Sequence, residues 1–132
     1  MANQDVRYYL NGMLLEVAGP AIRSVATDGH RLALCELIVD GLDSTPQQVI
    51  VPRKGVLELQ RLVGEHGECT VEIGSNHLRV SLDGIRLTSK LIDGRFPDYD
   101  RVIPRESEAP MMANRIELAD GLNRIRILAN EK

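Results

Sequence analysis

The strongest constraint on the fold of this chain is a hairpin signal in its first third. Two strand-like runs, Ile22 to Thr27 and Arg31 to Val39, flank the dipeptide Asp28-Gly29. An Asp-Gly pair between two such runs favours a tight turn that joins antiparallel strands. The second run carries apolar residues on both of its faces, so we expect neighbouring elements to cover both faces over part of its length.

Further strands and two helices are predicted around this hairpin. Val6 to Val17 is typical of a strand and is interrupted at Asn11-Gly12 by a turn or a bulge. A helix is predicted after Pro52, because proline lacks the N–H that would be unpaired in a first turn. Apolar residues then recur at helical spacing from Val56 to Val63, and Gly64 is of a residue type that often ends helices. The other expected elements are strands at 70–73, 78–82, 85–92 and 111–115 and a helix from 116 to the C-terminus. With two helices and roughly eight short strands, the sequence predicts an α+β domain with antiparallel pairing.

The composition fits one soluble globular domain. The chain has 132 residues, of which 43% are apolar and 27% are charged, and this length is typical of a single domain. No apolar run approaches the roughly 20 residues of a membrane helix, and the first residues lack the basic and apolar pattern of a leader. Cys35 and Cys69 lie in apolar runs, so we expect both to be small core residues of a cytoplasmic protein, kept reduced.

The overall charge argues against a nucleic-acid partner. The chain has 16 Lys and Arg against 19 Asp and Glu, which leaves a net charge of -3. Proteins that bind by neutralising phosphates are usually basic, and stacking on bases needs more aromatic side chains than this chain has. The local exception is the predicted helix after Pro52, because Arg53, Lys54 and Arg61 fall on the side opposite to its apolar residues.

The residue patterns do not favour an enzyme. A hydrolase would use Ser24 as the nucleophile and His30 as its base, oriented by Asp28. However, Asp-Gly followed by a polar residue is also what a tight turn requires. The three histidines and two cysteines lack the spacing of zinc ligands, and residues 64–67 lack the Lys and Ser/Thr of a phosphate-binding loop. We therefore predict no catalytic residue, no metal and no cofactor.

Two groups of residues on turns and strand ends have no obvious place in a core. Tyr8 and Tyr9 are neighbours in a predicted strand and point to opposite faces, so at most one of them enters the core. The hairpin tip, Thr27 to Leu32, concentrates hydrogen-bond donors and ends in an apolar residue. Such a tip either frames a groove for a peptide or is a solvated turn.

Four motifs carry a family resemblance. They are RYYLNGM at 7–13, VATDGHRLA at 25–33, VIVPRKG at 49–55 and SKLIDGRFPDY at 89–99. In this order they resemble the middle domain of the bacterial DNA polymerase III beta subunit, the beta sliding clamp, over most of residues 3 to 104. The resemblance implies a non-catalytic, ring-shaped processivity factor with helices on the inside and strands on the outside.

The resemblance also implies partners and site residues. Subunits of the family form head-to-tail dimers that encircle duplex DNA, and the polymerase III alpha subunit, the clamp loader and other proteins dock short peptide motifs between the middle and last domains. The implied groove residues are Arg7, Leu10, Gly12, Thr27, Gly29, His30, Arg31, Leu32, Pro97 and Val102. The residues expected to contact DNA are Gln4, Tyr8 and Tyr9, by resemblance, and Arg53, Lys54 and Arg61, from the basic helix face. A ring that holds DNA by topology needs only a mildly basic inner face, so the net negative charge of the chain does not exclude DNA as a partner.

The order of segments departs from that of the family repeat. Residues 1–104 resemble a middle domain that lacks its first strand and helix, and residues 105–132 resemble the first strand and helix of the clamp's third domain. The sequence therefore predicts a clamp fragment that holds one repeat in circularly shifted order. We expect residues 111–132 to complete the same fold, or else to exchange with a second copy. The alternative function is an isolated or engineered repeat that binds peptides weakly and does not encircle DNA.

Overall fold

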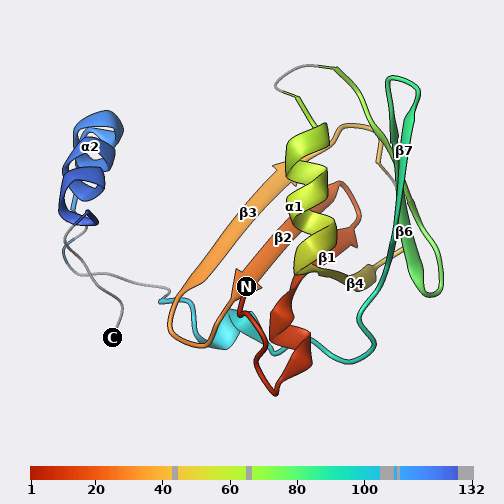
Figure 1. The fold of residues 1–132 in the computed structure, drawn as a ribbon, viewed down its shortest axis with the longest axis horizontal. Helices are drawn as coiled ribbons and strands as arrows, with labels where there is room; N and C mark the ends of the chain where they lie inside the picture. The colour runs from red at the N-terminus through yellow and green to blue at the C-terminus, as the bar shows by residue number, and fades with distance from the viewer. Residues whose placement is uncertain (43–44, 65–66, 105–108, 110, 128–132) are drawn as a thin grey trace. The chain divides into compact units, whose positions relative to one another are not determined.

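The computed structural model describes residues 1–42, 45–64, 67–104, 109 and 111–127, as Figure 1 shows. The chain divides into two compact units, Met1–Pro97 and Asp98–Lys132, and each is described by itself. The first unit contains two antiparallel sheets and one helix, and the second contains one helix after a short 3-10 turn. The predicted α+β class with antiparallel pairing is confirmed.

A four-stranded sheet forms the larger part of the first unit. Its strands are β1 (Gly12–Ala18), β2 (Ala21–Thr27), β3 (Leu32–Ile38) and β4 (Gln47–Pro52), in the order β3-β2-β1-β4. The predicted hairpin is β2–β3, in which Thr27 pairs with Leu32 across the turn. Leu14 of β1 lies between Val25 of β2 and Ile50 of β4 in the register, and all three side chains are buried.

A three-stranded sheet and the first helix complete this unit. The strands are β5 (Thr70–Ile73), β6 (His77–Leu82) and β7 (Ile85–Lys90), in the order β5-β6-β7. The Ile92 amide donates to the Ile50 carbonyl oxygen over 2.9 Å, and this contact joins the segment after β7 to β4. A buried cluster of Val51, Leu78, Val80 and Leu91 lies between the two sheets.

Helix α1 (Arg53–Leu62) begins directly after β4, as the sequence predicts. Pro52 precedes its first turn, where the missing N–H of proline costs no hydrogen bond. Val56 and Leu59 pack against the buried cluster, whereas Arg53 is exposed on the other side. Gly55 allows the helix to approach β7, because a Cβ atom there would be 2.6 Å from Ser89 Oγ. The amphipathic spacing therefore determines which side of α1 faces the sheets.

Helix α2 (Arg115–Ile125) belongs to the second unit, after the 3-10 turn η2 (Tyr99–Arg101). Asn114 caps it, because its side chain accepts hydrogen bonds from the amides of Ile116 (2.9 Å) and Glu117 (3.2 Å). The strand predicted at 111–115 is wrong: residues 111–114 form no strand and Arg115 is already helical. The helix predicted from 116 to the C-terminus is confirmed as far as Ile125, where α2 ends. The part of that prediction beyond residue 127 lies outside the described residues.

Near the N-terminus, the predicted strand from Val6 begins later. Tyr8–Asn11 form the 3-10 helix η1, and the strand starts at Gly12, so the described residues contain seven strands instead of about eight. Tyr8 is 60% exposed, in agreement with the prediction that at most one of the two tyrosines enters the core.

Two predictions about burial are wrong. Cys35 and Cys69 are both exposed, and six of the seven residues of β3 are exposed, whereas coverage of both faces was expected. The reason is position, because β3 lies at the edge of its sheet and, among the described residues, pairs only with β2. Apolar residues in a strand do not show whether another element packs on them.

Candidate functional site

The turn between β2 and β3 is closed by two side chains. Thr27 Oγ1 donates to the Arg31 carbonyl oxygen over 2.9 Å and accepts a hydrogen bond from the Gly29 amide over 3.1 Å. Gly29 has a φ of +90°, a conformation that favours glycine. The exposed residues Gly29, His30 and Arg31 therefore lie on a turn whose backbone is held in place.

Asp28 organises the residues that follow it. Its Oδ1 accepts from the amides of His30 (3.1 Å) and Arg31 (3.0 Å), and its Oδ2 accepts from Arg31 Nε (2.8 Å). These bonds, above all those from the backbone amides of Arg31 and His30, hold the pKa of Asp28 well below its usual range. Asp28 is thus ionised at neutral pH. Its carboxylate bonds the backbone amides and the Arg31 side chain, whereas a hydrolase would need it to bond the His30 ring.

The N-terminal segment lies beside this hairpin tip. A Cβ atom on Gly29 would be 3.3 Å from Arg7 Nη2, so the guanidinium of Arg7 packs on the glycine. Arg7 is itself held by Asp5, through Nε to Oδ1 (3.1 Å) and Nη2 to Oδ2 (2.9 Å). The hydrogen bonds from Arg7 lower the pKa of Asp5, and the carboxylate of Asp5 raises the pKa of Arg7. The fold therefore brings Arg7, Gly29, His30 and Arg31 of the predicted groove together.

The apolar members of the predicted groove lie in different environments. Leu10 is only 2% exposed, so its side chain packs in the core, and its amide donates to the Arg7 carbonyl oxygen. Gly12 is buried, whereas Leu32 is half-buried and Pro97 is exposed. Val102 is 68% exposed and belongs to the second unit.

A hollow joins the N-terminal segment to the start of α1. Three of the residues predicted to contact DNA, Gln4, Arg53 and Lys54, line it and are exposed. The other lining residues are Ala2, Asn3, Asn11, Pro52, Leu57 and Ile92. Two cations and several amide side chains at one surface suit a phosphate group, which is bound by charge and by N–H donors.

The other predicted DNA contacts differ in setting. The rings of Tyr8 and Tyr9 meet edge to face, with centroids 6.1 Å apart, and Tyr8 packs on Gly94, where a Cβ atom would be 3.6 Å from the ring. Arg61 lies in the last turn of α1 and is paired with Glu58 at 3.0 Å. Glu58 therefore offsets the charge of Arg61, while Arg53 and Lys54 have no ion pair within the described residues.

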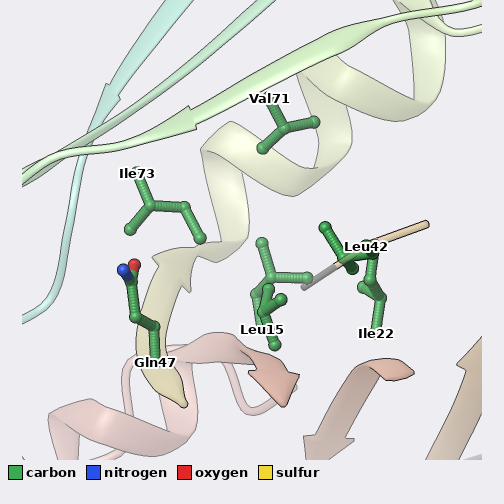
Figure 2. Close-up of a pocket in the computed structure, with 7 residues that line it drawn as sticks. Leu15, Ile22, Leu42, Gln47, Val71 and Ile73 are labelled. Atoms are coloured by element: carbon green, nitrogen blue, oxygen red, sulfur yellow. The ribbon is translucent and has the colours of Figure 1, made fainter. Parts of the chain in front are cut away.

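An apolar hollow, not foreseen from the sequence, opens between the two sheets. Figure 2 shows Val71 and Ile73 on one side of it and Leu15 and Ile22 on the other. Its volume is about 310 Å³, and Gln47 supplies its only polar side chain among the described residues. An apolar lining of this kind has no group that would act in catalysis.

Other kinds of site find no support in the described part of the chain. Among those residues, no group of three or more His, Cys, Asp or Glu side chains is placed to hold a metal ion. Ser24 lies within β2, opposite Cys35 in the register. No described helix has the length and apolar character needed to cross a membrane.

Residues 1–98 match the family model described as "DNA polymerase III beta subunit, central domain". The chain belongs to this family. It is 53% identical to the beta sliding clamp of Pseudomonas aeruginosa, over all of this chain and 36% of the relative. The resemblance of the four motifs is confirmed.

Solved structures of clamps agree with this assignment. A crystal structure of the Pseudomonas aeruginosa DNA polymerase sliding clamp matches with a TM-score of 0.86, over 99% of this chain and 36% of that one. The sliding clamp of Bacillus subtilis matches with a TM-score of 0.87 at 26% identity, over 99% of this chain and 35% of that one. The chain thus spans about a third of the length of these clamps.

The sequence predicted the hairpin tip and placed Asp28 in its turn, but it did not show that Asp28 holds Arg31 or that Asp5 holds Arg7. Asp5 and Asp28 each accept hydrogen bonds from a backbone amide two residues later and from a nearby arginine side chain. The signal in the sequence is an Asp with an Arg two or three positions later in a turn-forming segment. This signal is common in turns, so it does not reveal a functional site before the fold is known.

Proposed function

We propose that this chain serves as the central part of a sliding clamp, the ring that encircles duplex DNA and tethers the replicative polymerase. The observation that carries the proposal is 53% identity to a beta sliding clamp along the whole chain. A clamp acts by topology and carries out no chemical reaction, so the hydrolase interpretation of Ser24 and His30 is dropped. Because the chain spans about a third of its relatives, the ring is proposed for a longer protein.

The hairpin tip supports a role in binding partner peptides. His30 and Arg31 are exposed on a turn held by Thr27 and Asp28, and Arg7 lies beside them. Such donors suit the carbonyl and carboxylate oxygens of an extended peptide. We infer that the DNA polymerase III alpha subunit, the clamp loader and other clamp-motif proteins bind here, in a groove completed by another domain.

The hollow at the start of α1 supports contact with DNA. Gln4, Arg53 and Lys54 offer two positive charges and an amide at one surface, which would hold phosphates without reading sequence. Tyr8, Tyr9 and Arg61 are proposed to contact the same duplex. The ring is proposed to be a head-to-tail homodimer in the cytoplasm.

A chimeric clamp tests this proposal. In it, this chain replaces the matching third of the Pseudomonas aeruginosa clamp, and the ring is loaded on nicked circular DNA by the clamp loader of that organism. We expect the chimeric clamp to stay with the circular DNA through gel filtration and to leave after a single cut linearises it, because a ring slides off a free end. The unaltered Pseudomonas aeruginosa clamp is the control.

Two results would contradict the proposal. In the first, the chimeric clamp folds and reaches the size of the control ring but does not stay on circular DNA. In the second, it stays equally on circular and linear DNA, which indicates binding by affinity instead of encirclement.

A further inference from the structure

We propose that Asp28 is a positioning residue of the peptide groove, which holds the guanidinium of Arg31 and the backbone of His30 where a partner peptide meets them. The proposal rests on the function proposed above. It concerns a residue that the family resemblance did not include among the groove residues.

Within the described part of the chain, the carboxylate of Asp28 accepts hydrogen bonds only from the two groove residues that follow it, His30 and Arg31. Oδ1 accepts from the amides of His30 and Arg31 at 3.1 and 3.0 Å, and Oδ2 accepts from Arg31 Nε at 2.8 Å. A charge-assisted bond from a guanidinium is about twice as strong as a neutral one. Both oxygens of Asp28 are therefore used to fix the direction of its neighbours.

The two side chains of this pair differ sharply in exposure. The side chain of Arg31 is 80% exposed, whereas that of Asp28 is 19% exposed. Asp28 bonds only Nε of the guanidinium, and neither terminal nitrogen of Arg31 has a partner among the described residues. The planar fork of arginine suits a peptide oxygen when its direction is set in advance. Asp28 thus sets that direction and leaves the outer donors available.

The turn itself does not depend on the contact between Asp28 and Arg31 Nε. Thr27 Oγ1 already bonds the Arg31 carbonyl oxygen and the Gly29 amide, and the β2–β3 ladder pairs every residue from Thr27 to Ala21. Loss of the Nε contact would therefore free the Arg31 side chain without opening the hairpin. An exposed arginine that is free before binding must be ordered on binding, and this ordering lowers affinity.

The test uses the chimeric clamp with Asp28→Asn and a fluorescein-labelled clamp-motif peptide from the alpha subunit, followed by fluorescence anisotropy. Asparagine keeps an oxygen for the two backbone amides but has no second acceptor for Arg31 Nε. We expect the dissociation constant to rise about threefold to tenfold. In an Arg31→Gln background, Asp28→Asn is expected to cause no further rise, because its effect acts through Arg31.

A matched control removes an ion pair away from the groove. Glu72→Gln breaks the exposed pair between Glu72 and Arg79, 3.6 Å apart in the three-stranded sheet. We expect it to leave the dissociation constant unchanged. A rise equal to that of Asp28→Asn would overturn the proposal, because it would show a general effect of surface charge.

Three further results would overturn the positioning role. The first is an unchanged dissociation constant for Asp28→Asn, and the second is an equal rise with and without Arg31. If Asp28→Asn lowers the melting temperature, Arg31→Lys replaces it as the test variant, because it keeps Asp28 and the positive charge but lacks the planar guanidinium. The third result is that Arg31→Lys binds the peptide as tightly as the unaltered chimeric clamp. Retention of the unaltered chimeric clamp on circular DNA separates the two proposals: if that clamp is retained but Asp28→Asn leaves the dissociation constant of the peptide unchanged, only the proposal for Asp28 fails.

Discussion

Gly12 lies so close to Val51 that a Cβ atom added to the glycine would be 2.7 Å from the Val51 carbonyl oxygen. The same atom would be 2.6 Å from Ile50 Cγ2. Val51 is fully buried, and its backbone belongs to the β1–β4 ladder, so it has little freedom to move. Gly12 was implied as a groove residue by resemblance, and the structure shows in addition that it lets β1 approach β4.

The first prediction is that Gly12→Ala destabilises the fold. The added methyl group meets the Val51 carbonyl oxygen and the side chain of Ile50, and overpacking of this kind typically costs about 1–3 kcal/mol. Urea unfolding followed by far-UV circular dichroism measures the change. Gly121→Ala in α2 is the control, because no atom lies within 4 Å of its Cβ position; it should leave the stability equal or higher. Equal unfolding midpoints for Gly12→Ala and the unaltered chain would contradict the prediction.

The second prediction concerns the titration of Asp28. Its hydrogen bonds lower its pKa in the folded chain from the ordinary value of 3.8. The stabilisation that these bonds provide is therefore complete above the unfolded value and is lost as the pH falls through the lower folded value. Carbon-13 NMR of the carboxyl group should give a midpoint below 3.8. Arg31→Gln should raise that midpoint, and a midpoint at or above the ordinary value in the unaltered chain would be contrary to the structure.

The third prediction separates the cations of α1. Arg53→Gln or Lys54→Gln in the chimeric clamp should weaken its hold on DNA and reduce the slope of log affinity against log salt by about 1 each. Arg61→Gln should have a smaller effect, because Glu58 already lies 3.0 Å from Arg61. Binding of the ring to short duplex DNA at several salt concentrations measures both quantities. Equal losses of DNA affinity for all three variants would show that Glu58 does not reduce the contribution of Arg61 to DNA binding.

The fourth prediction is that the chain alone binds a clamp-motif peptide weakly. The hairpin tip offers donors, but the resemblance assigns half of the groove to a third domain. Fluorescence anisotropy should give a dissociation constant weaker than about 1 μM. The chimeric clamp, which has the other half, should bind the same peptide more tightly. Submicromolar binding by the chain alone would instead favour the alternative of an independent peptide-binding module.

The fifth prediction concerns residues 111–132. Ile116, Leu118, Leu122 and Ile125 of α2 are all exposed, and an amphipathic helix with an exposed apolar side calls for a partner. If this segment completes its own fold, light scattering should show a monomer of 14.7 kDa that melts cooperatively. A stable dimer would favour exchange of the helix between two copies. An aggregating chain without a cooperative melt would contradict both.

The local pattern of the chain was enough for several elements. Asp28-Gly29 predicted the turn of the β2–β3 hairpin, and Pro52 with the following apolar spacing predicted α1. These predictions succeeded because turn geometry and helical periodicity depend on residues only a few positions apart. The motifs also identified the family, because their residues and order are specific.

Burial and side-chain partners depend instead on segments far apart in the chain. Apolar residues on both faces of β3 are compatible with an edge strand as well as with a covered one, so the exposure of Cys35 follows only from the strand order. The closeness of Arg7 to Gly29, and of Gln4 to Arg53, likewise comes from folding of the N-terminal segment onto the sheet. Local sequence thus specifies turns and helices through short-range geometry, while packing brings distant residues together and creates the surfaces that partners would meet.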